Sequence, residues 1–166
     1  MKRILTWTGL ILVLVAVGVI TGCAVSNGGG SGTHAMKEQV VVGTGTWKVI
    51  GVERVKQTTS GAKASGEFVF INMQLKNISN EAANLTGVEI ELVDEDNNTY
   101  NFDSQQNSSF LTSMGKDSLI KGRVEPGETV SGWVAFDVST DAHGIKLKVR
   151  DLDITSSKSA LIDLKI

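Results

Sequence analysis

The sequence contains few cysteine, histidine, proline or aromatic residues, and each shortage excludes a class of protein. Its 1 cysteine and 2 histidines cannot supply an internal disulfide or the usual ligand set of a zinc site. Its 1 proline and 5% aromatic residues do not fit a disordered chain or a surface that stacks nucleic-acid bases. Hydrophobic residues still make up 41% of the 166 residues, enough for one packed domain. We predict no cofactor, because no motif for holding one is present.

The charge balance disfavours nucleic acid as a partner. Lys2 and Arg3 are the charged residues among the first 22, and the 14 basic and 18 acidic residues that follow give that part a net charge of −4. A protein that binds the phosphate backbone needs a basic face. We therefore predict no nucleic-acid partner.

The first 22 residues have the organisation of a secretory signal peptide. Lys2 and Arg3 form a positive start, residues 10–20 are apolar, and the small residues Thr21 and Gly22 precede Cys23. This order is typical of an export segment that is removed from the mature protein. We predict a signal helix over residues 1–22, with cleavage between Gly22 and Cys23.

Ile20-Thr21-Gly22-Cys23 resembles the bacterial lipobox. The resemblance implies that a diacylglyceryl group is attached to the Cys23 thiol and that Cys23 becomes the acylated N-terminus. A thiol is a nucleophile suited to alkylation, and two acyl chains anchor a protein stably where one does not. The alternative is an uncleaved membrane helix, since residues 4–22 are uncharged and approach the roughly 20 residues that span a bilayer. Either arrangement places the remaining chain on the extracytoplasmic face of the cell membrane.

Residues 23–36 combine the lipidated cysteine with a glycine- and serine-rich stretch. Residues 24–34 carry no charge and little apolar surface, so we predict a flexible tether that spans about 20 Å on average. The glycines do not form a phosphate loop, because no Gly-Lys-Ser/Thr sequence follows them.

Residues 37–166 show apolar residues at every second position, the pattern of half-buried strands. The clearest alternations lie at 69–75, 88–92, 130–138, 145–149 and 160–166, and shorter strands are predicted at 39–42, 46–55, 82–86, 99–102 and 119–124. Turn sequences separate the runs, and Pro126-Gly127 fits a type II turn. Trp47 and Trp133 lie in strand-like runs, which predicts core positions. Seven to nine strands favour an all-β sandwich, with a loop or short helix at 103–116.

Six segments of this region, taken together, resemble a known family. They are VIGVERV at 49–55, GEFVFI at 66–71, LKN at 75–77, IELVD at 90–94, VEPGE at 124–128 and GWVAFDV at 132–138. The series resembles a family of extracellular immunoglobulin-like domains of unknown function found in lipoproteins of Gram-positive bacteria. That family is similar in fold to a small secreted mycobacterial antigen. The resemblance covers about residues 39–150 and implies an immunoglobulin-like sandwich, a membrane anchor and an extracellular setting. The family has no agreed catalytic residues, so the resemblance assigns none to this chain.

Two groups of charged residues are candidate binding sites. The acidic turn at 94–98 offers Asp94, Asp96 and Asn98 to calcium, which prefers such oxygen ligands, although the turn lacks the glycine and distal glutamate of an EF-hand. The alternative is a hairpin turn whose side chains bond their own backbone. Lys146, Lys148 and Arg150 share one strand face that would suit an anionic wall polymer or lipid headgroups. The alternative there is pairing across strands with Glu89 and Glu91.

Three classes of function fit these features. The first is a non-enzymatic, membrane-anchored extracellular lipoprotein whose sandwich binds or supports an envelope protein or a cell-wall polymer; a calcium-dependent adhesion module is a variant of it. The second is an extracellular enzyme or enzyme-accessory domain in which Asp103, Asp137 and Asp141 converge in a pocket. The third, a solute receptor, is disfavoured because residues 37–166 leave no room for a two-lobed clamp. The sequence does not specify an oligomeric state.

Overall fold

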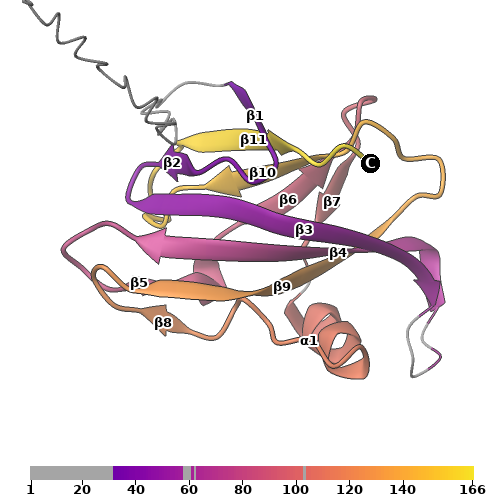
Figure 1. The fold of residues 1–166 in the computed structure, drawn as a ribbon, viewed down its shortest axis with the longest axis horizontal. Coiled ribbons are helices and arrows are strands. Elements are labelled where there is room, and N and C mark those ends of the chain that lie inside the picture. Colours follow the sequence, from indigo (N-terminus) through magenta and orange to yellow (C-terminus); the bar gives the residue numbers. More distant parts are fainter. Residues whose placement is uncertain (1–31, 58–60, 62, 103) are drawn as a thin grey trace, which may run out of the picture.

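Two β-sheets packed face to face form the body of the protein (Figure 1). The structure, a computed structural model, describes residues 32–57, 61, 63–102 and 104–166. The predicted signal helix and the lipidation site at Cys23 lie outside the described residues. In chain order the strands are β1 (Thr33–Ala35), β2 (Val40–Val42), β3 (Gly45–Gln57), β4 (Lys63–Asn77), β5 (Ala83–Asn84), β6 (Ile90–Val93), β7 (Thr99–Asn101), β8 (Arg123–Val124), β9 (Thr129–Val138), β10 (Lys146–Arg150) and β11 (Ser159–Asp163). A short 3-10 turn η1 (Leu85–Gly87) and one helix, α1 (Ser104–Ser113), complete the described chain.

The larger sheet has the strand order β1-β11-β10-β6-β7, and the other has the order β2-β3-β4-β9. Strands β5 and β8 pair as a small third sheet. The two large sheets hold nine strands, so the all-β sandwich predicted from the sequence is confirmed. Most pairings are antiparallel, while β1 runs parallel to β11.

The domain begins earlier than predicted. Residues 33–36 were expected to belong to the flexible tether, but β1 (Thr33–Ala35) pairs with the edge of β11 and is part of the sheet. Its three residues carry no apolar alternation that would reveal a strand. They pair because an open sheet edge offers backbone donors and acceptors to any extended segment.

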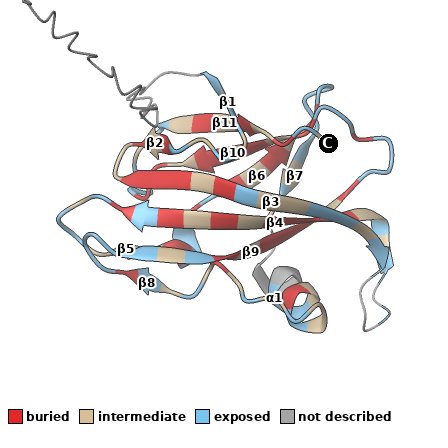
Figure 2. Cartoon of the chain, in the orientation of Figure 1, coloured by how far each residue is buried: buried red, intermediate tan, exposed pale blue. Residues whose placement is uncertain are grey.

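The core lies between the two sheets and follows the predicted alternation (Figure 2). Val69, Ile71, Met73 and Leu75 of β4 are buried, while Asn72 and Gln74, which alternate with them, are only half-buried. The other sheet supplies the facing side of the core through buried residues of β6 and β10, namely Ile90, Leu92, Leu147 and Val149. Each fully buried aliphatic side chain contributes about 1.5–3 kcal/mol to folding, so this period-two pattern fixes which face of each strand turns inward.

A second apolar cluster covers the outer face of the four-stranded sheet. Phe68, Phe70 and Leu111 are buried there, and α1 lies beside β9 (Figure 1). Helix α1 occupies the region in which a loop or short helix was predicted. Among the residues that the structure describes, no helix is long and apolar enough to cross a membrane.

Trp133 does not occupy the core position predicted for it. It is half-buried on this outer face, where the Lys116 Nζ lies 3.6 Å from the centroid of its ring and 2.8 Å from a carboxylate oxygen of Glu53. Trp47, by contrast, is fully buried in the main core, as predicted.

Gly132 allows a loop to run directly against β9. A Cβ at this position would lie 2.4 Å from the backbone nitrogen of Leu119, closer than any side chain tolerates. The loop is held there by two hydrogen bonds, in which the N–H of Trp133 donates to Asp117 at 2.8 Å and the N–H of Leu119 donates to Trp133 at 2.9 Å. The glycine of the GWVAFDV segment therefore serves packing.

Candidate functional site

The chain enters the sandwich at an end that we call the β1 end. Because β1 is parallel to β11 with Thr33 opposite Leu161, the residues that precede Thr33 leave toward the start of β11. The loop at 151–158, which joins β10 to β11, lies at this end. The loop at 78–82, which follows β4, lies there too, since both loops line one groove.

The groove at the β1 end has a volume of about 590 Å³. It is bounded by Thr44, the loop that leads into β5, the turn η1 and the segment 152–154. Ile154 on its rim is 72% exposed, and Ile78 in the loop beside it is 46% exposed. Isolated exposed apolar residues are common on protein surfaces, but two beside one apolar-lined groove mark a candidate interaction site.

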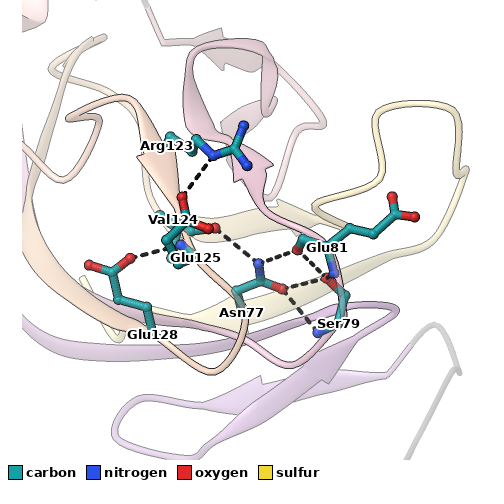
Figure 3. A network of polar contacts seen from close by, with 7 residues as sticks. All are labelled: Asn77, Ser79, Glu81, Arg123, Val124, Glu125 and Glu128. Atoms are coloured by element: carbon teal, nitrogen blue, oxygen red, sulfur yellow. Dashed lines mark hydrogen bonds and ion pairs between the residues drawn. The ribbon is translucent and has the colours of Figure 1, made fainter.

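One wall of the groove is fixed by Asn77, the last residue of β4 (Figure 3). Its side chain is fully buried, and its Nδ2 donates to the carbonyls of Glu81 at 2.8 Å and Val124 at 3.1 Å. Its Oδ1 accepts from the backbone N–H of Ser79 at 3.0 Å and from the Ser79 hydroxyl at 2.8 Å. All the polar atoms of this amide are satisfied, so the turn at 78–81 is held against β8 in one conformation.

The opposite wall is fixed by Asp151, a buried carboxylate. Its Oδ1 accepts from the backbone N–H of Thr44 at 2.8 Å and from the Thr44 hydroxyl at 2.6 Å. Burial raises the pKa of Asp151, but the hydrogen bonds from Thr44 and neighbouring donors together outweigh it, so the net shift is downward. Gly43 makes the contact possible: its φ is 55°, and a Cβ there would lie 1.7 Å from Asp151 Oδ2.

Ile154 is presented by a rigid turn. The N–H of Ser156 donates to the carbonyl of Asp153 at 2.9 Å, which closes a β-turn with Ile154 at its first corner. The carboxylate of Asp153 accepts from the backbone N–H of Thr155 at 2.9 Å and from its hydroxyl at 2.7 Å. The isoleucine is therefore held outward by bonds that do not involve its own side chain.

The groove offers a mixed contact surface. Its lining combines alanine, leucine and isoleucine side chains with the hydroxyl and amide groups of Thr44, Ser79, Asn80 and Thr86, and with the acids Glu81 and Asp153. The carboxylate of Asp153 accepts its hydrogen bonds from Thr155 within the same turn. Such a set fits a partner that presents both apolar and polar groups.

The predicted calcium turn has the geometry of the hairpin alternative. Asp94 accepts hydrogen bonds from the backbone N–H of Asn98 at 2.8 Å, from its side-chain amide at 2.9 Å and from the Tyr100 hydroxyl at 3.0 Å. The amide of Asn98 is the chief cause of the lowered pKa of Asp94. No group of three or more acidic, histidine or cysteine side chains that could hold a metal ion occurs in the described part of the chain.

Of the predicted catalytic carboxylates in the described residues, Asp137 and Asp141 do not line a common pocket. Asp137 accepts from the backbone N–H groups of Ser65 at 2.7 Å and Gly66 at 3.2 Å, so it anchors the start of β4 against β9. The shallow hollow beside it is lined by residues 65–66 and 137–140, and Asp141 is not among them. Asp103 lies outside the described residues.

Lys148 and Arg150 of the basic stripe on β10 are paired across strands, as the alternative for them predicted. Lys148 Nζ lies 2.8 Å from a carboxylate oxygen of Glu91, and Arg150 Nε lies 2.9 Å from one of Glu89. Glu91 and Glu89 thereby offset the charges of Lys148 and Arg150 on this strand face.

Two features escaped the sequence analysis. The groove could not be predicted because its lining comes from segments far apart in the chain. The one local signal was Asn77, the asparagine that ends the LKN segment. The contact of His143 Nε2 with a carboxylate oxygen of Glu95 escaped for the same reason. There the carbonyl of Asp141, 2.7 Å from His143 Nδ1, and then the charge of Glu95 raise the pKa of the imidazole.

These features define a β-sandwich whose loops form an apolar groove at the end where the chain enters. The chain belongs to the family described as Domain of unknown function (DUF4352), whose family model matches residues 34–160. This confirms the resemblance drawn from the sequence at the level of the domain family. No curated protein matches the sequence significantly.

Several solved structures are similar to this chain. The secreted protein MPT63 of Mycobacterium tuberculosis is 13% identical with a TM-score of 0.58, and the match covers 81% of this chain and 98% of that one. The yjhA protein of Bacillus subtilis is 18% identical with a TM-score of 0.55, over 79% of this chain and 99% of that one. An uncharacterized beta-sandwich protein of Clostridium difficile is 14% identical with a TM-score of 0.52, over 82% and 97%. At such identities the likeness concerns the fold alone.

Proposed function

We propose that the protein is an extracellular lipoprotein, held in the cell membrane by acyl chains on Cys23, and that its sandwich is a non-catalytic binding module. The observation that carries the binding role is the groove at the β1 end with its exposed Ile154. The side chain of an isoleucine that a rigid turn holds in water lacks the favourable free energy of transfer out of water. A partner that covers the side chain supplies this free energy.

The non-catalytic role is supported by how the acidic side chains are used. Asp94, Asp137 and Asp151 each accept hydrogen bonds from backbone N–H groups and thereby hold turns and strands in place. Their oxygens face protein donors instead of a substrate.

The anchor is supported by the lipobox-like sequence before Cys23 and is tested by replacing that thiol. In a bacterial host that processes lipoproteins, the full chain should incorporate a clickable fatty acid and fractionate with membranes. Cys23→Ala should lose the label and either release the domain or leave an unprocessed precursor. Ser26→Ala, three residues further along the tether, is the matched control and should keep the label. A Cys23→Ala protein that stays membrane-bound at the mature size would refute lipidation.

The binding role is tested by photo-crosslinking on intact cells. A benzophenone amino acid placed at Asn80, an exposed residue that lines the groove, should give adducts with an envelope component. The same probe at Thr140, exposed in the loop after β9, is the control and should give few. Equal adduct formation at the two positions would contradict a role for the groove.

A further inference from the structure

The exposed apolar side chains gather where the chain leaves for its anchor. Three large hydrophobic residues of the described chain are markedly exposed, and two of them, Ile78 and Ile154, belong to the β1 end. Thr44 lies between their loops: its carbonyl accepts from the N–H of Ile78 at 2.9 Å, and it lines the groove together with Ile154. The third, Ile50, lies within β3.

The chain preceding β1 is short. Nine residues, 24–32, separate Cys23 from Thr33. A glycine-rich stretch of this length spans about 17 Å on average, and about 30 Å when fully extended. An anchored Cys23 therefore keeps the β1 end of the sandwich within about 30 Å of the bilayer surface.

We infer that the β1 end docks on the membrane surface, with Ile154 and Ile78 inserted at the level of the lipid headgroups. The inference rests on the proposed lipid anchor and names the bilayer as the partner of the groove. Tethering removes the translational cost of association, so the contact of two isoleucines is enough to select one orientation.

The surroundings of Ile154 suit an interface of apolar chains and polar headgroups. Thr155, Ser156 and Ser157 follow it with hydroxyl groups, and the exposed Lys158 can extend its amine toward the headgroups. The exposed acids Glu81 and Asp153 lie at the same end, so attraction to anionic lipid does not drive the contact. Docking is expected on neutral and on anionic bilayers alike.

The test uses the full lipidated chain in vesicles of phosphatidylcholine, with and without phosphatidylglycerol. Ser157→Cys introduces a free thiol at the β1 end for an environment-sensitive fluorophore, because the Cys23 thiol is acylated. Thr140→Cys places the same label at the opposite end of the sandwich. Thr140 follows β9, whose last residue lies opposite Glu67 near the start of β4, whereas the groove lies beyond the last residue of β4. A nitroxide-labelled lipid should quench the label at position 157 and spare the label at position 140.

The contribution of Ile154 is measured by a matched pair of substitutions. Ile154→Ser should lower the ratio of docked to undocked protein about tenfold, since most of one isoleucine side chain is no longer transferred out of water. Ile50→Ser, the same change on β3, should leave the ratio unchanged.

The outcomes separate the anchor from the docking. Failure of the protein to float with vesicles would overturn the anchor and the docking with it. A protein that floats but shows equal quenching at positions 157 and 140 would overturn the docking alone. Quenching that needs phosphatidylglycerol would contradict apolar contact. Shielding of position 157 that appears only in native membranes would assign the surface to another protein. Shielding that increases with the number of protein molecules per vesicle would assign it to a second copy. Either result would overturn the inference.

Discussion

Asn77 is the residue whose replacement tests the construction of the groove most directly. Its buried amide makes four hydrogen bonds that join the end of β4, the turn at 78–81 and β8 (Figure 3). Asn77→Ala leaves the buried carbonyl of Val124 without this donor. The groups of Ser79 and Glu81 are partly exposed, so water replaces their bonds in part. With about 1–3 kcal/mol for each buried group left unsatisfied, we expect a loss of about 3 kcal/mol in the free energy of unfolding.

Asn77→Asp separates hydrogen bonding from volume. The side chain keeps its size, but a carboxylate oxygen then faces the carbonyls of Glu81 and Val124 in place of an N–H donor. The folded state therefore favours the protonated acid, and the pKa of the introduced group rises above the unfolded value of about 3.9. Because the folded state then binds more protons than the unfolded state, the stability of this variant falls as pH rises. Near neutral pH we expect a loss of about 3–5 kcal/mol.

Guanidinium unfolding of the purified protein, followed by tryptophan fluorescence, to which the buried Trp47 contributes, measures both variants. Asn80→Ala, an exposed asparagine in the same turn, is the control and should change stability by less than about 0.5 kcal/mol. A loss below about 1 kcal/mol for Asn77→Ala, or an Asn77→Asp variant with the pH profile of the parent, would refute the reasoning.

Two further predictions concern Gly43 and the contact between two loops. Gly43→Ala forces a Cβ onto Asp151 Oδ2 at positive φ and should lower the free energy of unfolding, measured by thermal denaturation, by about 2–3 kcal/mol. The control Gly115→Ala, at φ 63° in open space, should lower it by about 1 kcal/mol. Equal losses for the two variants would contradict the clash. The pKa of His143, measured by NMR titration, should lie above its usual value and fall in Glu95→Gln. Because this pKa is raised by folding, the stabilisation is complete below about pH 6.5 and is lost as pH rises through the folded pKa. A stability that instead rises over that range would contradict the assignment.

The strands whose apolar and polar residues alternate most regularly were predictable, because successive side chains of a strand point to opposite faces of the sheet and the apolar ones must be buried. In β4, β6 and β10 the residues of the predicted apolar alternation are the ones that are buried. Pro126-Gly127 forms the expected turn, in which the N–H of Glu128 donates to the carbonyl of Glu125 at 3.0 Å and Gly127 has a φ of 77°. Strand β1 was missed because its pairing comes from the edge of β11 and not from its own residues. Trp133 was misplaced because its strand has apolar residues on both faces, and only α1 and Lys116 decide what covers the outer one.

The sequence by itself determined the class of fold and the inward face of the long strands, because period-two hydrophobicity acts between neighbours along the chain. The order of residues 1–22 and the lipobox-like cysteine are also linear patterns, and the export and lipidation that they predict stay predictions. Only the tertiary structure decided the groove: Thr44, Ile78 and Ile154 approach one another through Asn77 and Asp151, whose partners lie as far as 107 positions away. Contacts of that range depend on how the two sheets are stacked, and no local pattern in the chain specifies them.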